Sequence, residues 1–354
     1  MKWDIIIVGA GPAGLYSAKL CEKMGFKVAV LEEHSEIGKP MQCSGLISTN
    51  LKRFVKLNRE WIDHKVKGAI LHSPSGITIR LEKKNTAAYV VNREKFDRFL
   101  SEDLQSEIFL DTRAKSIFVN KNRAVVKTQN NTLFSEIIFG CDGPHSLVRR
   151  HFGVKPKEML TGIIALEDKP DDSKYVEIWF DKKLCADGFV WKIPRGSKTE
   201  YGMLSKKPSF RTLERFFNLD NYSKISGPIP MGTHRIHFTR TLLIGDAASQ
   251  VKPWSGGGVI YSLTAAKIAA SVASKAFEKG DFSEGALKEY EEKCAEKINK
   301  HIELGMMFRE FYRKLSNPQI DKMFERFKEM KFMNSLDMDF PIETLIGVKE
   351  AVYL

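Results

Sequence analysis

The sequence contains few cysteines, and none of them is placed as a metal ligand or in a redox pair. Only five occur among 354 residues, at Cys21, Cys43, Cys141, Cys185 and Cys294, with no CxxC pair and no metal-ligand spacing. This pattern excludes a disulfide framework and a zinc-ribbon type of site. We therefore expect a protein of the reducing cytoplasm that holds no metal.

The sequence also lacks internal repeats, low-complexity segments and any apolar run long enough to cross a bilayer. The best candidate span, residues 259–277, is interrupted by Lys267 and Lys275, whereas a spanning helix needs about 20 mainly apolar residues. No secretory signal precedes the first predicted strand. We expect a cytoplasmic protein that touches a membrane only peripherally.

Acidic residues are in the minority. The chain has 56 Lys and Arg against 44 Asp and Glu, a net charge of +12, and residues 182–215 hold nine basic residues and three acidic ones. Such charge attracts nucleic acid, anionic membranes or phosphorylated substrates. No nucleic-acid-binding motif is recognisable, so we expect no nucleic-acid partner and favour a membrane face or an anionic substrate. A solvated basic surface is the alternative.

A dinucleotide-binding pattern opens the chain. The apolar run 5–8 predicts a buried strand, and Gly9, Gly11 and Gly14 follow it with GxGxxG spacing. These glycines permit a tight turn, close approach of a pyrophosphate and close helix packing, and the N-terminus of the following helix favours phosphate. A second apolar run ends at Glu32, which suits a ribose diol. The motif alone does not choose between FAD and NAD.

The rest of the chain alternates between strand and helix patterns. An amphipathic run covers 46–57, a hairpin is predicted over 66–81, and Asn92 is placed to cap a helix that begins at Arg93. Further strands are expected at 87–91, 108–110, 116–119, 123–128, 133–139, 162–166, 175–180, 188–193, 200–204 and 241–244, and helices over 259–277, 282–315 and 318–331.

Four short segments stand in a fixed order along the chain. They are the glycine triplet with Glu32, Arg93 with Asp97, the GCDG turn at 140–143 and the GDAA turn at 245–248. Together they resemble the p-hydroxybenzoate hydroxylase-like flavoproteins, which bind FAD in an extended pose. The resemblance implies that the dinucleotide is FAD.

Three further segments resemble the geranylgeranyl reductases within that family. PMQCSG at 40–45 is similar to their PxxC[GS]G loop beside the flavin, and KPWSGGG at 252–258 to their proline-glycine loop over the isoalloxazine. FVWKIP at 189–194 resembles their aromatic-x-Trp-x-aromatic-Pro signature, except that Ile193 replaces an aromatic residue and Gly202-Met203-Leu204 stands where GxG is expected. The resemblance implies an enzyme that saturates C=C bonds of geranylgeranyl chains.

The resemblance also implies a set of FAD contacts, to which bare N–H groups near Gly257 are added on physical grounds. Asp246 suits a ribityl hydroxyl, and Arg93 suits a phosphate or, as the alternative, a salt bridge with Asp97 or Glu94. The predicted cofactor-binding residues are Gly9, Gly11, Ala13, Gly14, Glu32, Cys43, Ser44, Leu46, Arg93, Ala114, Asp246, Gly257, Gly258 and Val259.

The expected chemistry is delivery of a hydride from reduced flavin to an alkene in a dry, apolar site. Phe189, Trp191, Trp254 and Tyr261 are the candidates for lining a prenyl tunnel, with ordinary core packing as the alternative. Because an isolated alkene also needs a proton, Cys43 is the candidate catalytic residue; the alternative is that it packs against the flavin. NADH, NADPH and reduced ferredoxin remain open as electron donors.

We therefore expect an α/β fold with an α+β insert, working as a monomer. Its parts are a Rossmann-like FAD-binding domain from 1–65, 86–155 and 236–280, a β-sheet substrate (catalytic) domain from 66–85 and 156–235, and a helical region at 281–354. Residues from 332 onward either cap the cavity or pack against the body of the protein.

The expected substrate is a digeranylgeranylglycerophospholipid. Geranylgeranyl diphosphate, a chlorophyll precursor or a menaquinone tail stay open as substrates. An aromatic monooxygenase, a flavin-dependent halogenase and a flavin-carrying electron-transfer protein are the alternative functions.

Overall fold

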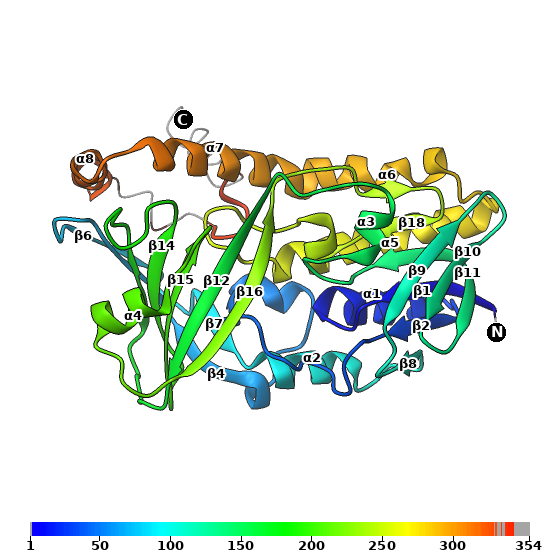
Figure 1. The fold of residues 1–354 in the computed structure, drawn as a ribbon, viewed down its shortest axis with the longest axis horizontal. Coiled ribbons are helices and arrows are strands. Elements are labelled where there is room, and N and C mark those ends of the chain that lie inside the picture. The colour runs from blue at the N-terminus through cyan, green and yellow to red at the C-terminus, as the bar shows by residue number, and fades with distance from the viewer. Residues whose placement is uncertain (1, 329, 331–333, 335–336, 343–354) are drawn as a thin grey trace.

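Two large β-sheets lie side by side along the long axis of the molecule, and a row of helices follows one edge of both (Figure 1). The computed structural model describes residues 2–328, 330, 334 and 337–342. Most of the predicted C-terminal stretch beyond 328 lies outside the described residues.

The first sheet has eight strands and is built around β1 (Lys2–Val8). Its order is β17-β18-β11-β1-β2-β8; in addition, β10 pairs with β11, and β9 pairs with β10. Strand β1 runs parallel to both β2 and β11. Ile5, Ile6 and Ile7 have no exposed surface, as expected for a central parallel strand covered on both faces. The other bounds are β2 (Val28–Leu31), β8 (Glu107–Phe109), β9 (Ala114–Val119), β10 (Ala124–Thr128), β11 (Thr132–Gly140), β17 (His237–Phe238) and β18 (Thr241–Leu243).

The second sheet has seven strands in the order β16-β12-β15-β14-β13-β5-β6. Neighbours are antiparallel except β13 and β5, which are parallel, and the predicted hairpin of 66–81 is present as β5 and β6. Helix α4 (Phe210–Phe217) packs on β15 and β12. The bounds are β5 (Gly68–His72), β6 (Thr78–Glu82), β12 (Glu158–Glu167), β13 (Tyr175–Trp179), β14 (Phe189–Pro194), β15 (Thr199–Ser205) and β16 (Ser223–Met231).

A small third sheet is built from chain segments that lie, in the sequence, between strands of the two large sheets. It contains β3 (Leu46–Ser48), β7 (Ala88–Val91) and β4 (Ile62–Val66) in that order. The amphipathic run of 46–57 is therefore divided between a strand, which pairs with β7, and the 3-10 helix η1 (Thr49–Arg53), which Ser48 caps by accepting from the Asn50 N–H. A second 3-10 turn, η2 (Arg59–Trp61), precedes β4.

Helices complete the fold around these sheets. Helix α2 (Arg93–Ser101) begins as predicted, with the Asn92 side chain accepting from the Lys95 N–H. The others are α1 (Pro12–Lys23), α3 (Leu147–His151), the 3-10 turn η3 (Gly245–Ala248), α5 (Val259–Lys279), α6 (Glu284–Cys294), the π-helical turn η4 (Ala295–Asn299), α7 (Lys300–Lys314) and α8 (Asn317–Lys328). Helices α6 and α7 run along the edge from the first sheet to the second (Figure 1). None of the helices in the described part of the chain combines the length and apolar composition that a bilayer span requires.

Candidate active site

A cavity of about 1040 Å³ is lined by residues of both large sheets and of α7. Ligand pockets commonly measure about 300–1,000 Å³, so this one has room for a large cofactor together with part of a second ligand. Every predicted cofactor-binding residue except Gly14, and every predicted substrate-lining residue except Tyr261, lines it.

The glycine turn after β1 forms one end of the cavity. Gly9 has a φ of +102°, and a Cβ there would lie 2.4 Å from the Cys141 carbonyl oxygen. A Cβ at Gly14 would lie 1.9 Å from the Gly9 oxygen, so this glycine lets α1 pack closely and stands behind the cavity wall. Gly11 has no atom within 4 Å of its Cβ position. The turn thus leaves open space in front of the first N–H groups of α1, which is what a pyrophosphate requires.

Glu32 is held beside this turn by backbone donors. Its Oε2 accepts from the Ala10 N–H at 2.8 Å, and its Oε1 accepts from the His34 N–H at 3.0 Å. Each carboxylate oxygen has two lone pairs. Both on Oε1 are engaged, because His34 Nδ1 also lies 2.6 Å from it, so Oε2 has the lone pair that a ribose hydroxyl can use. The contact with Ala10 links the acid directly to the glycine turn.

Arg93 makes the salt bridge that the sequence left as the alternative to a phosphate contact. Its Nε and Nη2 atoms donate to the two Asp97 oxygens at 2.8 Å each, and Asp97 is buried. Burial opposes the charged form of Arg93, but Asp97 and the nearby Cys43 side chain outweigh it and raise the pKa of this guanidinium. Arg93 also lines the cavity, so a fixed cation stands next to Cys43.

Asp246 faces the cavity from the turn after β18. Burial raises its pKa to about 6, although Arg93 and Arg149 favour the charged form. Arg149 ties this turn to the GCDG turn: its Nη1 donates to the Ala247 oxygen at 3.2 Å and its Nη2 to the Pro144 oxygen at 2.6 Å. Two turns that are distant in the sequence are therefore held as one surface.

The glycine loop before α5 forms the next part of the wall. The Lys252 N–H donates to the Gly257 oxygen at 3.0 Å, and a Cβ at Gly258 would lie 3.2 Å from Asp246 Oδ1. A side chain at 258 would therefore press on Asp246 and fill space that the cavity now has. With Gly257, Gly258 and Val259 all lining the cavity, the N-terminus of α5 opens toward it. The two helix N-termini and the open glycines fit FAD as the bound group.

A buried ion pair that the sequence did not reveal lies behind this loop. Lys252 Nζ is 2.6 Å from Asp339 Oδ1, and the two side chains are 6% and 0% exposed. Burial alone would raise the pKa of Asp339, but Lys252, together with hydrogen bonds from Ser48 and Asn50, lowers it. Tyr261 is buried, does not line the cavity, and donates its hydroxyl to the Asp339 backbone oxygen at 2.6 Å.

This ion pair brings the C-terminal segment to the site. Asp337, Met338, Asp339 and Pro341 all line the cavity, so residues 337–342 form part of its wall. Their sequence carries no motif that would have indicated this position. Residues from 332 onward were expected either to cap the cavity or to pack against the body of the protein. Those that the structure describes lie at the cavity.

Aromatic side chains of the second sheet and of the glycine loop line the other end. The rings of Phe189 and Trp191 lie 5.7 Å apart between centroids. A Cβ at Gly202 would lie 2.1 Å from the Trp191 ring, and one at Gly305 would lie 2.5 Å from the Trp254 ring. Each tryptophan ring therefore occupies space that a side chain at the facing glycine would fill.

Arg195 connects this aromatic wall to the loop that carries Cys43. Its Nη1 donates to the Ser44 backbone oxygen at 2.5 Å and to Glu200 Oε2 at 3.0 Å, while Glu200 Oε1 accepts from Trp191 Nε1 at 2.9 Å. Burial raises the pKa of Glu200, although Arg195 and Trp191 favour its charged form. The sequence analysis missed Arg195, and only the sheet topology brings it to Ser44.

Cys43 itself is partly buried and lines the cavity. Its sulfur accepts a long hydrogen bond from the Gly45 N–H at 3.4 Å. Within the described residues, no three His, Cys, Asp or Glu side chains gather as metal ligands would. Cys43, Arg93, Asp246 and the Lys252–Asp339 pair are among the polar groups that line the cavity.

Comparison with known proteins gives a consistent result. The profile of the FAD binding domain family matches residues 2–182. A digeranylgeranylglycerophospholipid reductase of Methanothrix thermoacetophila is 29% identical over 91% of this chain and 90% of its own. One of Methanocaldococcus jannaschii is 26% identical over 99% and 96%.

Solved structures share the fold. A geranylgeranyl bacteriochlorophyll reductase-like protein of Thermoplasma acidophilum superposes with a TM-score of 0.85 at 22% identity, covering 98% of this chain and 95% of that one. A flavin-dependent brominase superposes with a TM-score of 0.70 at 16% identity over the whole of both chains. The two have different activities on one architecture, so the fold alone does not define the reaction.

Proposed function

Because the chain belongs to the FAD binding domain family, we propose that it is an FAD-dependent reductase that saturates the C=C bonds of geranylgeranyl chains in a digeranylgeranylglycerophospholipid. The curated relatives that match nearly the whole chain carry that activity in their names. The observation that carries the proposal is that the glycine turns and the aromatic side chains of Phe189, Trp191 and Trp254 line the same cavity.

Reduced FAD, when bound, supplies a hydride to one alkene carbon. The chain's own residues position the two partners. The glycine turns, Glu32 and Asp246 hold the dinucleotide, and the apolar wall orients the prenyl chain and excludes water. Arg195, by holding both Ser44 and Glu200, keeps the Cys43 loop at a fixed distance from Trp191.

The second alkene carbon needs a proton, and Cys43 is our candidate for supplying it or for orienting the group that does. Its thiol lines the cavity on the loop that also carries Ser44. The guanidinium of Arg93 lines the same cavity. A purely packing role for Cys43 predicts that its substitution leaves the reaction rate unchanged.

The electron donor in this proposal is NADH, NADPH or reduced ferredoxin. The basic stretch 182–215 serves the phosphate of the lipid headgroup or an anionic membrane surface. The enzyme works as a monomer on lipid at the membrane surface.

Product analysis tests the proposal. The purified protein, loaded with FAD and reduced with dithionite, is incubated without oxygen with a digeranylgeranylglycerophospholipid, and in parallel with geranylgeranyl diphosphate. The lipid is expected to gain two hydrogens per reduced bond by mass spectrometry. If only the diphosphate is reduced, geranylgeranyl diphosphate is the substrate. If neither lipid is reduced, and the reduced protein consumes oxygen rapidly when air and aromatic acids are added, the protein is a monooxygenase and not a reductase.

A further inference from the structure

The outer face of α7 carries a stripe of exposed apolar side chains. Leu304, Met307, Phe308 and Phe311 are 37%, 69%, 41% and 55% exposed. They recur at the spacing of one helix face, while His301, Gly305 and Tyr312 of the same helix face inward and are buried. We call these four residues the α7 stripe.

The α7 stripe is continuous with the cavity. Leu304 and Phe308 both line the cavity wall and reach the outer surface, so they lie at its rim. Met307 and Phe311, the more exposed pair, lie further out on the same helix. An apolar path therefore leads from the surface of α7 to the chamber that contains Phe189 and Trp191.

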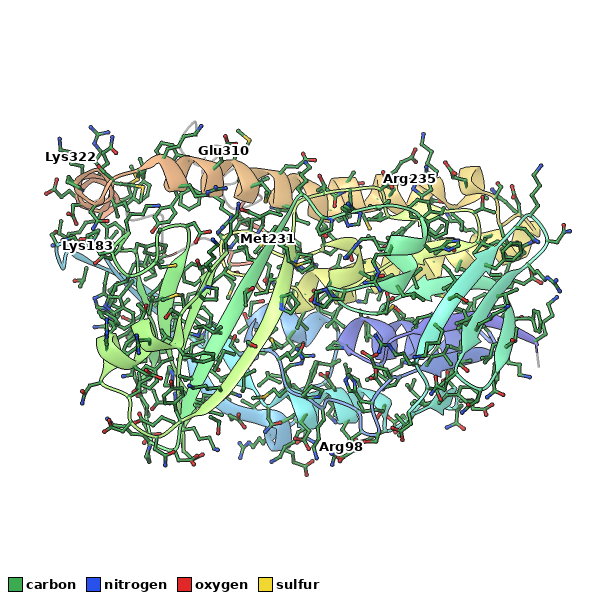
Figure 2. The ribbon with its side chains drawn as sticks, viewed as in Figure 1. Arg98, Lys183, Met231, Arg235, Glu310 and Lys322 are labelled. Atoms are coloured by element: carbon green, nitrogen blue, oxygen red, sulfur yellow. The ribbon has the colours of Figure 1, made fainter. Side chains whose placement is uncertain are left out.

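Basic residues surround one end of the α7 stripe. Arg313, Lys314 and, on α8, Lys322, Arg326 and Lys328 are exposed. Arg313 and Lys314 are already paired, with Glu158 at 3.4 Å and Glu310 at 3.3 Å, so α8 supplies the cations that remain. Glu310 and Lys322 mark this outer edge in Figure 2. The stretch 182–215 begins near this end of α7, because the Lys182 ammonium lies 3.8 Å from the Tyr312 ring centroid and the Lys182 backbone N–H donates to Asn317 Oδ1 at 2.9 Å.

Acidic residues at the same edge are few or already paired. Glu310 lies 3.3 Å from Lys314, and the Asp321 carboxylate accepts from the Ser73 hydroxyl at 2.6 Å. Glu303 on α7 and Glu325 on α8 are the remaining exposed acids in the described part of these two helices. An apolar strip with cations at its border is the pattern of a surface that enters the headgroup region of an anionic bilayer.

We propose that the α7 stripe docks this protein on an anionic lipid bilayer, so that a prenyl chain passes from the membrane past Leu304 and Phe308 into the cavity. The inference rests on the proposed function for the identity of the lipid that enters. The docking step itself depends only on the stripe and its cations. This docking places the rim of the cavity at the membrane, in addition to the basic stretch 182–215.

Vesicle sedimentation tests this with a matched pair of variants. Phe311→Asp introduces a charge into the α7 stripe, and Phe118→Asp does the same on β9, at the other end of the molecule in Figure 1, where Phe118 is 54% exposed. Vesicles of phosphatidylcholine with phosphatidylglycerol are the probe. Phe311→Asp should bind them about five-fold more weakly or worse, and Phe118→Asp within about two-fold of wild type.

Two further readouts separate the alternatives. Thermal midpoint and FAD content verify that both variants are folded, and the milder Phe311→Ser replaces Phe311→Asp if that variant is not. The proposal would be overturned if the folded Phe311 variants bound vesicles as tightly as wild type, or if Phe118→Asp lost as much binding as Phe311→Asp. A change of oligomeric state in light scattering would instead show that the α7 stripe contacts a second copy of the chain.

Turnover measurements distinguish this inference from the proposed function. The stripe variants should lose turnover of prenyl lipid in vesicles and keep it for the same lipid dispersed in detergent. If wild type reduces the lipid in neither form, the proposed function fails while the vesicle result still decides the docking surface. If it reduces both and the variants match it in both, docking fails and the reductase stands.

Discussion

Removing the Asp339 carboxylate should both destabilise the protein and open the wall of its cavity. In Asp339→Asn, with the one remaining side-chain oxygen turned toward Ser48 and Asn50, the Lys252 ammonium, whose side chain is 6% exposed, keeps the Met338 backbone oxygen at 3.3 Å as its hydrogen-bond partner. Breaking a buried pair by removing one partner costs about 3–5 kcal/mol. Because the amide can still accept from Ser48 and Asn50, we expect the lower end, about 3 kcal/mol.

The assay is urea unfolding followed by circular dichroism, with FAD content measured on the same samples. Asp103→Asn is the matched control, since Asp103 is 84% exposed and 3.6 Å from Lys19; it should unfold close to wild type. The double variant Lys252→Met with Asp339→Leu should recover part of the loss, because no buried charge is left unpaired.

The pH dependence gives a second measure of the same pair. The folded-state pKa of Asp339 is lowered, so its contribution to stability is present above the ordinary carboxyl pKa and is lost as the pH falls through the lowered value. The gap between wild type and Asp339→Asn should therefore shrink in acid. A gap that is absent at neutral pH, or that widens in acid, would refute the reasoning.

Three other changes have expected outcomes. Gly202→Ala places a Cβ 2.1 Å from the Trp191 ring and should cost about 1–3 kcal/mol, seen as a lower thermal midpoint, and slow prenyl reduction; an unchanged rate would mean that Trp191 does not shape the lipid end. Asp246→Asn should weaken FAD binding about ten-fold or more in a fluorescence titration. Because the pKa of Asp246 is raised from 3.8 to about 6, the protein without FAD should lose stability as the pH rises through this interval, and Asp246→Asn should abolish that loss. Cys43→Ala should slow alkene saturation about 100-fold with normal FAD content if the thiol supplies the proton, and normal rates would leave it a packing role.

Local sequence rules predicted residues that line the cavity at the glycine turn, because the signals there are short-range. Glycine spacing, the strand before Gly9 and the acid at Glu32 each depend on a few neighbouring residues. The cap at Asn92 was predicted for the same reason and is present. The FAD family assignment is confirmed by the profile match over residues 2–182, whereas the domain boundaries and individual FAD contacts stay predictions.

The contacts that the sequence analysis missed join residues that are far apart in the sequence. Arg195 reaches Ser44 across 151 positions, and Lys252 reaches Asp339 across 87. Neither pair has a spacing rule, since sheet topology and the path of the C-terminal segment bring them together. Tyr261 was predicted to line the tunnel but does not line the cavity. The first turn of α5 decides which side chains there face the cavity, and the Tyr261 hydroxyl donates to the Asp339 backbone oxygen instead.

The proposed reaction requires flavin and prenyl lipid to meet in one cavity, and single-turnover stoichiometry tests this requirement most directly. Reduced, FAD-loaded protein is mixed without oxygen with a digeranylgeranylglycerophospholipid, and flavin reoxidation and bond saturation are measured in the same sample. We predict one C=C bond saturated for each flavin reoxidised. Flavin that stays reduced, or that is reoxidised while the lipid mass remains unchanged, would contradict the account.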